Sequence, residues 1–371
     1  MGCRILLLNE RDPRHPRSGG AEVHIAEVAS RLAERGYETT LAACGFAGAP
    51  AHERVGALDV RRLGPLPAYY PRVAWLCARE TRRGRFDVVV EHLNKLPFFS
   101  PLLSAAPVLV VCHHLFGRSA YLQVPWPIAT AVVAAEQAIP LFYRHTDFVA
   151  VSESTRASLV ARGIRAERIR VVYNGIRQPG ADAGPPPSRR GMRVVYLGRV
   201  EPYKRVDLML RALAPLVPRF PDLAIDVLGR GHDLPRLEQV ARALGLADRT
   251  RFRGFVDDAE RDAILARSRV CVCPSVKEGW GITVIEANAM GVPVVATDAP
   301  GLRDAVRDGE TGLLVDSSDP ASWSVQIERL LANDLLVDEL SEAARAWSRQ
   351  FDWDVAAEQM ADAIDALRER P

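Results

Sequence analysis

Two basic residues follow an apolar, strand-like segment in the second half of the chain. The sequence reads RVVYLGRVEPYKR, so Arg199 comes directly after the segment and Lys204 five residues later, just before a helix expected from Val206. Open parallel sheets bind ligands beyond the carboxyl ends of their strands. Two cations beside a helix N-terminus suit a diphosphate, whose charge they would stabilise as it departs. Two solvated loop residues are the alternative interpretation.

Two glutamates flank a glycine-rich turn further along, in the run KEGWGITVIEANAM. Glu278 and Glu286 have Gly279 and Gly281 between them, and apolar spacing predicts a short helix over 282–290. The glycines would let backbone N–H groups approach a phosphate at the helix start. Because a helical turn rises about 5.4 Å, the two carboxylates can reach groups on either side of one diphosphate. Alternatively, one is a surface residue and the other an acid favoured by the helix dipole.

The first half of the chain offers two further groups of this kind. Gly19 and Gly20 precede an expected helix, where their N–H groups can serve a phosphate or an acceptor group, or simply close the loop. His113 and His114 directly follow an apolar strand at 108–112, so that a side chain can enter a cleft beyond the strand. A hydrogen-bonded structural histidine is the other interpretation.

The elements that must position these residues alternate regularly along both halves. Apolar runs bounded by turn residues alternate with amphipathic helical stretches, which is typical of parallel sheets covered by helices on both faces. The predicted fold class is therefore α/β, with two Rossmann-like, doubly wound domains. The expected strands are 4–8, 38–43, 87–90, 108–112, 148–151 and 169–172 in the first half, and 193–197, 224–228, 250–253, 270–273, 292–296 and 313–315 in the second.

A segment without periodicity separates the two halves. Residues 175–192 read GIRQPGADAGPPPSRRGM, a composition typical of an exposed linker. The predicted domains are 1–174 and 193–350, since 371 residues exceed what one hydrophobic core usually serves. The amphipathic stretch 351–371 is expected to form a helix that packs on another element.

Composition and net charge reduce the number of functional classes to which the protein can belong. The formal net charge of +2 gives no general reason to expect nucleic-acid binding. The start of the chain lacks the long apolar stretch and cleavage site of a signal peptide, so we expect a cytoplasmic protein. The cysteines lie mostly in apolar, strand-like runs without metal-site spacing, which favours reduced core residues and no metal site. These cysteines are Cys3, Cys44, Cys77, Cys112, Cys271 and Cys273.

Several motifs in one order carry a family resemblance. They are SGGAEVHIAEVASRLAERGYETTL, VSESTRASLVARGI, VVYNGI, YLGRVEPYKRVDLML, and EGWGITVIEANAMGVPVVA followed by ETGLLV. Together they resemble family 4 of the retaining glycosyltransferases, and the resemblance runs along almost the entire chain. It implies a GT-B fold in which the second domain binds a nucleotide sugar, the first binds the acceptor, and the C-terminal helix crosses back to the first domain.

The resemblance also implies roles for individual side chains. The family is metal-independent, so Arg199 and Lys204 would neutralise the departing diphosphate as a divalent cation does in other transferases. Glu278 would bind hydroxyls of the donor sugar and Glu286 the ribose. His113 matches a strand-end histidine that contacts the donor sugar.

Backbone contacts follow from the same resemblance. They are Gly281, Ile282, Thr283 and Val284 with the diphosphate, Gly19 and Gly20 with the diphosphate and acceptor, and Phe255 and Val256 with the base. The match leaves the choice between uracil and guanine open. His114 stands where relatives often have Asp, which leaves its role open as well.

The implied reaction moves a hexose-type sugar from a UDP- or GDP-linked donor to a hydroxyl of a glycan, a lipid-linked acceptor or a small molecule, with the anomeric configuration kept. Double displacement would need a carboxylate nucleophile near the anomeric carbon. For this family a front-face mechanism is usually proposed, in which the leaving phosphate takes the acceptor proton and Glu278 only positions the sugar. A metal-free GT-B epimerase and a non-catalytic nucleotide-sugar binder are the alternatives.

One stretch in the first half of the chain has a composition that can contact a membrane surface. Residues 61–86 interleave arginine with tyrosine, tryptophan and leucine, so they can dock on anionic lipid at the inner membrane face, which suits a lipid-linked acceptor. A solvated amphipathic helix is the alternative. The apolar residues 127–143 are expected to lie in the core.

Overall fold

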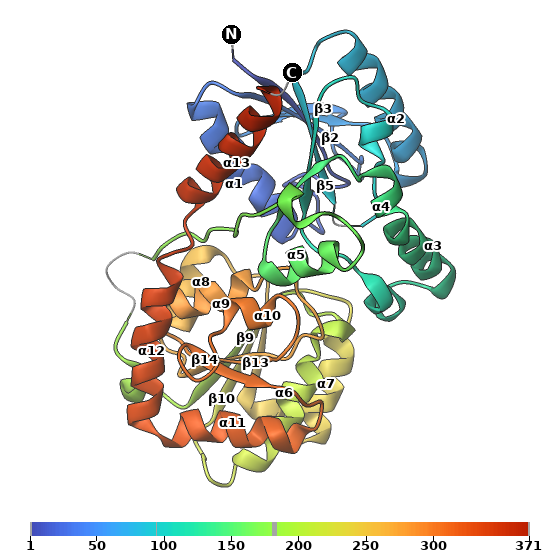
Figure 1. Ribbon diagram of the computed structural model, residues 1–371. Helices are drawn as coiled ribbons and strands as arrows, with labels where there is room; N and C mark the ends of the chain where they lie inside the picture. The colour runs from blue at the N-terminus through green and yellow to red at the C-terminus, as the bar shows by residue number, and fades with distance from the viewer. Residues whose placement is uncertain (1, 94, 180–183, 370–371) are drawn as a thin grey trace. The chain divides into compact units, whose positions relative to one another are not determined.

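The computed structural model describes residues 2–93, 95–179 and 184–369, which form two compact units (Figure 1). The first unit contains the chain up to Gly175 together with the residues from Asp352 on. The second unit is Ile176–Phe351. Each unit consists of a sheet and the helices that cover it, so the predicted α/β fold class with two parallel-sheet domains is confirmed.

The sheet of the first unit has the strand order β3-β4-β2-β1-β5-β6-β7-β8. All neighbours pair in parallel except β3 and β4, which form an antiparallel hairpin at the sheet edge. Sequence periodicity did not predict this hairpin, because its two strands are short and half-exposed. The strands are β1 (Arg4–Leu8), β2 (Glu38–Ala43), β3 (His52–Val55), β4 (Leu58–Arg62), β5 (Val88–Leu93), β6 (Val108–Cys112), β7 (Asp147–Ala150) and β8 (Ile169–Val171).

Helices cover both faces of this sheet. On one face lie α2 and α4, whose apolar side chains pack on β1, β5, β6 and β7. On the other face α1 and α13 pack against each other and on β1 and β5. The helices of the unit are α1 (Gly20–Glu34), α2 (Leu66–Arg82), α3 (Trp126–Gln137), α4 (Ile139–Phe142), α5 (Glu153–Val160) and α13 (Trp353–Arg368), with the 3₁₀ turns η1 (Ser100–Leu102) and η2 (Gly117–Leu122) between β5 and α3.

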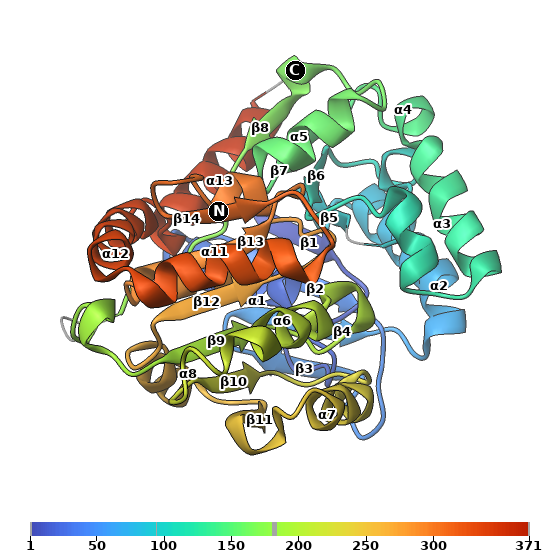
Figure 2. The same ribbon diagram turned by 90° about the horizontal axis from the view of Figure 1, so that it is seen from below.

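The sheet of the second unit is parallel throughout, in the order β11-β10-β9-β12-β13-β14 (Figure 2). Its strands are β9 (Arg193–Leu197), β10 (Ala224–Leu228), β11 (Thr250–Gly254), β12 (Val270–Cys273), β13 (Val294–Thr297) and β14 (Gly312–Val315). The helices are α6 (Val206–Leu213), α7 (Leu234–Ala243), α8 (Asp258–Leu265), α9 (Ile282–Ala289), α10 (Leu302–Ala305), α11 (Pro320–Ala332) and α12 (Asp334–Ser348), and the turns η4 (Pro187–Arg189) and η5 (Pro202–Lys204) flank β9.

Each sheet has one position where the order of its strands reverses. In the first unit the chain extends from β1 to β2 on one side and later to β5 on the other. In the second it extends from β9 to β10 on one side and later to β12 on the other. The loops that leave two such neighbouring strands diverge to opposite faces of the sheet, which opens a crevice at the carboxyl ends of the strands.

The segment 175–192 differs from the exposed linker that its composition suggested. Residues 180–183 lie outside the described residues, but η4 packs on α12 and the following Arg190 is buried. Its guanidinium donates to the carbonyl oxygens of Leu265, Ser268 and Met290 at distances of 2.9–3.2 Å. These carbonyls lie at or just beyond the ends of α8 and α9, where helices leave carbonyl groups without intrahelical partners. This part of the segment is therefore integrated into the second unit.

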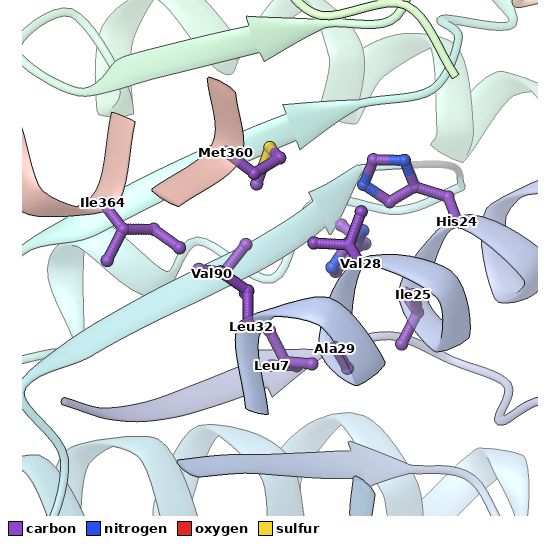
Figure 3. A pocket seen from close by; sticks show the side chains of 10 residues that line it. Leu7, His24, Ile25, Val28, Ala29, Leu32, Val90, Met360 and Ile364 are labelled. Carbon is purple, nitrogen blue, oxygen red and sulfur yellow. The ribbon is translucent and has the colours of Figure 1, made fainter. Parts of the chain in front are cut away.

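Helix α13 belongs to the first unit although it follows the second in sequence. Met360 and Ile364 face Val28 of α1 and Val90 of β5 around a mostly apolar cavity of about 10 Å³ (Figure 3). A cavity of this size has room for about one water molecule, so it is a packing gap and not a ligand site. The hydroxyl of Tyr37 donates to a carboxylate oxygen of Asp365 at 2.6 Å and fixes the far end of the helix.

Replacing Ile364 by alanine should loosen this helix. Ile364 is fully buried and lines the existing gap, so Ile364→Ala should lower the free energy of unfolding of the first unit by about 2–4 kcal/mol. Val355→Ala, on the exposed side of the same helix, should change it by less than about 0.5 kcal/mol. Urea denaturation and hydrogen exchange of the α13 amides measure the change in unfolding free energy for both variants. Equal effects of the two substitutions would show that α13 is not docked in this way.

Candidate active site

A lysine–glutamate ion pair spans the crevice of the second unit. Lys204 lies in η5 after β9, Glu278 lies in the loop after β12, and the Lys204 ammonium contacts the Glu278 carboxylate. The two side chains are only 11% and 18% exposed. Burial lowers the pKa of Lys204, but its interactions with Glu278, Tyr203 and Cys273 together outweigh this effect and leave the pKa above its ordinary value. The lysine is therefore charged at neutral pH. The structure thus brings together two of the side chains that the sequence singled out separately.

Tyr203 connects this pair to Arg199. The guanidinium of Arg199 donates to the Tyr203 hydroxyl at 2.7 Å, and the Lys204 Nζ lies 5.2 Å from the centre of the tyrosine ring. The Tyr203 carbonyl in turn accepts a hydrogen bond from the backbone of Val276 in the loop after β12. Sequence reasoning overlooked this tyrosine. Its position between the two basic residues, in EPYKR, was the available signal.

Close backbone packing explains the glycines around Glu278. A Cβ at Gly281 would lie 2.9 Å from the Cβ of Ala305. Gly301 has a φ of +82°, and a Cβ there would lie 2.4 Å from the carbonyl oxygen of Glu278. The Glu278 amide also donates to the carbonyl of Pro300 at 3.2 Å. The sequence had suggested ligand approach as the reason for Gly281, whereas contacts within the protein already require it.

Helix α9 starts directly after this loop. Gly281 is its N-cap residue and supplies no side-chain cap, and Ile282, Thr283 and Val284 form the first turn. Ile282 and Thr283 are half-buried. The N–H groups of a first turn favour anions. Those of Ile282 and Val284 already donate to the carbonyl oxygens of Trp280 and Gly281, at 2.9 Å each, so two of the amides predicted to contact the diphosphate are engaged within the protein.

Glu286 lies one turn into α9 and forms an ion pair with Arg261 of α8. Its carboxylate accepts from the guanidinium at 2.8 Å, and its side chain is 18% exposed. Burial raises the pKa of Glu286 to about 7, an effect that Arg261 opposes and that Asp258 and Asp262 reinforce. Arg261 was not among the predicted residues. It follows the acidic run DDAE at a spacing that places it on α8, but nothing local points to a partner 25 residues away.

Phe255 and Val256 lie in the short connection between β11 and α8. The Phe255 ring is 68% exposed, with the Arg230 guanidinium 5.4 Å from its centre. The next residue, Asp257, caps α8 by accepting from the amide of Glu260 at 2.8 Å. This connection leads directly into α8, which carries Arg261, the ion-pair partner of Glu286. Phe255 and Val256 therefore lie only a few residues before the arginine that holds the Glu286 carboxylate.

In the first unit, His113 belongs to a buried group of histidines. The rings of His113 and His92 stack at 5.3 Å, and His92 Nδ1 lies 3.0 Å from His113 Nε2. His24 of α1 lies edge-on to His113 at 5.2 Å and hydrogen-bonds the Asn174 side-chain oxygen at 2.8 Å. Burial lowers the pKa of all three histidines, which are therefore neutral at pH 7. Sequence reasoning overlooked His24 and His92, which lie inside apolar helix and strand patterns.

The glycine pair of the first unit closes a loop in this structure. Gly19 is the N-cap of α1, and its amide donates to a carboxylate oxygen of Glu22 at 2.6 Å. The side chain of Asn9 donates to the other oxygen at 3.0 Å, which ties the helix start to the end of β1. The Gly19 N–H is thus engaged within the protein, and Gly20 is the first residue of the helix. The His114 ring packs against Phe116 at 4.5 Å.

The crevice of the first unit carries a lysine–glutamate pair of its own. Glu10 follows β1, Lys95 follows β5, and their charged groups are in contact. Tyr70 donates to the Glu10 carboxylate at 3.4 Å, and the Arg11 guanidinium lies 3.8 Å from it. Burial lowers the pKa of Lys95. Sequence reasoning did not identify this group, because the partners are 85 residues apart and follow no shared motif.

Comparisons with known proteins show which family the chain resembles. Residues 187–347 match the glycosyl transferases group 1, and residues 18–178 match glycosyltransferase family 4. The chain is 30% identical to the phosphatidyl-myo-inositol mannosyltransferase of Mycobacterium leprae over 92% of this chain and 91% of the relative.

Two solved structures share the fold. Sucrose-phosphate synthase from Thermosynechococcus elongatus superposes with a TM-score of 0.81 at 21% identity, over 98% of this chain and 99% of the other. Anabaena HepE, solved with UDP and glucose, superposes with a TM-score of 0.77 at 19% identity, over 98% of this chain and all of the other. This chain has the GT-B fold and belongs to the group 1 glycosyltransferases of glycosyltransferase family 4.

Proposed function

We propose that the protein is a retaining, metal-independent hexosyltransferase that moves a sugar from a UDP- or GDP-linked donor to an acceptor hydroxyl. The observation that carries the proposal is the charged Lys204–Glu278 pair, with Arg199 held beside it, in the crevice of the second unit. Departure of a nucleoside diphosphate leaves negative charge that two fixed cations stabilise. The solved complex of HepE with UDP and glucose supports a nucleotide-sugar donor.

On the donor side, each side chain has a distinct task. Lys204 and Arg199 bind the diphosphate together with the first turn of α9 and supply the charge that a divalent cation would otherwise provide. Glu278 accepts hydrogen bonds from hydroxyls of the donor sugar, and Glu286 does the same for the ribose. The backbone at Phe255 and Val256 contacts the base.

The transfer itself occurs on one face of the sugar. The bond from the anomeric carbon to the diphosphate oxygen breaks, and the bond to the acceptor oxygen forms on the same side. The leaving phosphate oxygen takes the acceptor proton, so no protein base is required. Because this front-face transfer needs no carboxylate nucleophile, Glu278 positions the sugar and does not attack it. His113, neutral and held by His92, contributes a hydrogen bond to the donor sugar.

The first unit binds the acceptor. The Glu10–Lys95 pair offers both a hydrogen-bond acceptor and a cationic donor, a combination that suits a hydroxyl-rich ring. The Mycobacterium leprae relative is named for a phosphatidyl-myo-inositol substrate. The acceptor classes to test are a glycan, a lipid-linked acceptor and a small polyol. The protein works in the cytoplasm or at the inner face of the membrane.

A ligand panel tests the donor assignment first. Thermal unfolding is followed with UDP, GDP, ADP and dTDP and their sugar conjugates, in buffer with a metal chelator. We expect one nucleotide family to raise the melting temperature, because a ligand that binds the native state stabilises it. The stabilising donor is then incubated with and without candidate acceptors. Conversion of the donor sugar without acceptor would instead indicate an epimerase, and no shift with any nucleotide would contradict the proposal.

Loss of the lysine charge should affect turnover far more than folding. Lys204→Ala should lower kcat about 10²–10³-fold, because it removes charge stabilisation from the transition state. Lys204→Arg should restore part of the loss, and Arg211→Ala, an exposed arginine of α6, should behave like the unmodified protein. Steady-state kinetics give the comparison, with melting temperatures as a check on folding. Unchanged kcat in Lys204→Ala would remove Lys204 from the mechanism.

The raised pKa of Glu286 predicts a pH dependence. In the folded chain its pKa is about 7, above the ordinary value of 4.5, so the folded state holds the proton more tightly. The stability contributed by this proton is complete below about pH 4.5 and is lost as pH rises to 7. The difference in unfolding free energy between the unmodified protein and Glu286→Gln should therefore fall by about 1–3 kcal/mol over that range.

The affinity for the nucleotide should change with pH in the direction opposite to the stability, rising where the stability falls. The ionised carboxylate accepts hydrogen bonds from the ribose, so affinity for the nucleotide should rise as pH increases through about 7 and be nearly flat in Glu286→Gln. Calorimetric titrations between pH 6 and pH 8, about one unit on either side of that pKa, measure the effect. The same pH slope in both proteins would show that another group is responsible.

A further inference from the structure

An uncharged apolar surface projects from the first unit. Eight of the sixteen large apolar side chains that are exposed in the described part of the chain lie between Leu102 and Phe142. Trp126 is 73% exposed and Leu141 is 68% exposed. We call the following residues of η2, α3 and α4 the apolar face: Tyr121, Leu122, Trp126, Ile128, Leu141 and Phe142. Soluble proteins rarely expose such a group of large side chains without a partner.

The structure corrects part of the expectation that residues 127–143 lie in the core: Ile139 and Tyr143 do, but much of α3 does not. Only one side of α3 is buried, at Ala129, Val132 and Glu136. The Glu136 carboxylate accepts from the amides of Phe116 and Gly117, which fixes α3 against η2. The opposite side carries apolar residues as well, so composition alone could not distinguish the buried side from the exposed one.

A strongly basic helix accompanies the apolar face. Residues 66–86, which contain α2, hold five arginines and one glutamate, a net charge of +4, whereas the whole chain has a net charge of only +2. The arginines are all exposed: Arg72, Arg79, Arg82, Arg83 and Arg85. Trp75 is 61% exposed on the same helix and lies under the Arg79 guanidinium, 4.6 Å from its ring centre.

Helices α2 and α4 lie over the same face of the sheet. Tyr69 and Val73 of α2 pack on it together with Val89, while Ile139 and Tyr143 pack on it together with Val110. Figures 1 and 2 both show α2, α3 and α4 on one side of the first unit. The basic segment that contains α2 and the elements that carry the apolar face therefore lie on the same side of the first unit.

We propose that this side of the first unit docks on the surface of a bilayer that contains anionic lipid. The apolar face enters the boundary between headgroups and acyl chains, where tryptophan and tyrosine are favoured, and the arginines contact lipid phosphates. Between Ser100 and Tyr143 the only charged residues are Arg118 and Glu136, so little charge has to be desolvated. No described helix is long and apolar enough to span a membrane, which makes this a surface contact.

Several features favour a bilayer over a protein partner. The apolar face has no charge pattern of its own that would select one protein, whereas the neighbouring charges are almost all of one sign. Arg79, Arg83 and Arg85 lie 2.9–3.9 Å from the one glutamate among them, Glu80, and the segment keeps its net charge of +4. A layer of anionic headgroups matches this excess of one sign without requiring a fixed protein partner. Docking needs neither donor nor acceptor, so the proposal goes beyond the transfer reaction and can fail independently of it.

Vesicle flotation with the full chain tests the proposal. One set of vesicles is pure phosphatidylcholine, and a second contains about one-third phosphatidylglycerol. We expect the protein to float with the anionic vesicles, with binding at least about tenfold weaker to the neutral ones and reduced by salt. The triple variant Trp126→Ser/Ile128→Ser/Leu141→Ser should lose about tenfold or more in binding to anionic vesicles.

Matched variants separate the contribution of the arginines to vesicle binding from that of the apolar face. Arg79→Ala/Arg82→Ala/Arg83→Ala should abolish the preference for anionic lipid, whereas Leu335→Ser and Val325→Ser, which remove exposed apolar side chains from the second unit, should bind like the unmodified protein. Melting temperatures and nucleotide-induced shifts check that each variant is folded. Absence of flotation, or equal losses in the control variants, would overturn the proposal. A concentration-dependent dimer that the triple variant abolishes, without vesicle binding, would assign the face to a second copy of the chain instead.

Discussion

The reversal of strand order beside β1 and beside β9 is the constraint on which both candidate sites depend. At each reversal two neighbouring parallel strands send their loops to opposite faces of the sheet, so the carboxyl edge is left open there. Each unit uses its opening in the same way, with a lysine from one loop and a glutamate from the other in contact across it.

A charged pair in such an opening has a physical consequence for ligand binding. Isolated charges would be costly to keep away from water, and each partner lowers that cost for the other. A ligand that offers both an anion and hydroxyl groups can replace the internal contact by two external ones. In the proposed complex Lys204 would interact with the anion and Glu278 would accept a hydrogen bond from a hydroxyl, so each charged group would exchange one polar partner for another. The surrounding loops need little rearrangement, because the Tyr203 backbone and the close packing at Gly301 hold them in place.

Much of the fold followed from sequence periodicity, and much of the site did not. The strands at 4–8, 38–43, 108–112, 193–197, 224–228 and 270–273 have the predicted bounds, because buried parallel strands are continuous apolar runs with clear breaks. The β3–β4 hairpin escaped prediction because edge strands are half-exposed. Residues next to a strand end, such as Lys204 and Glu278, could be proposed from local pattern. Tyr203 could have been proposed in the same way, from its position beside Lys204. Arg261, the partner of Glu286, and the pair Glu10–Lys95 depend on which distant segments meet, and a single sequence does not encode that in any local motif.

The position of α13 has a consequence for the order in which the molecule is made. The first unit needs this helix to cover α1, yet the helix is encoded after every residue of the second unit. During synthesis from the N-terminus, the second unit is complete before the ribosome has released α13. Until then Val28 and its neighbours on α1 lack the side chains of Met360 and Ile364 that bury them in the finished protein. The domain that begins the chain is therefore the last to be completed, and a chain truncated before Trp353 would leave a finished second unit attached to an unfinished first one.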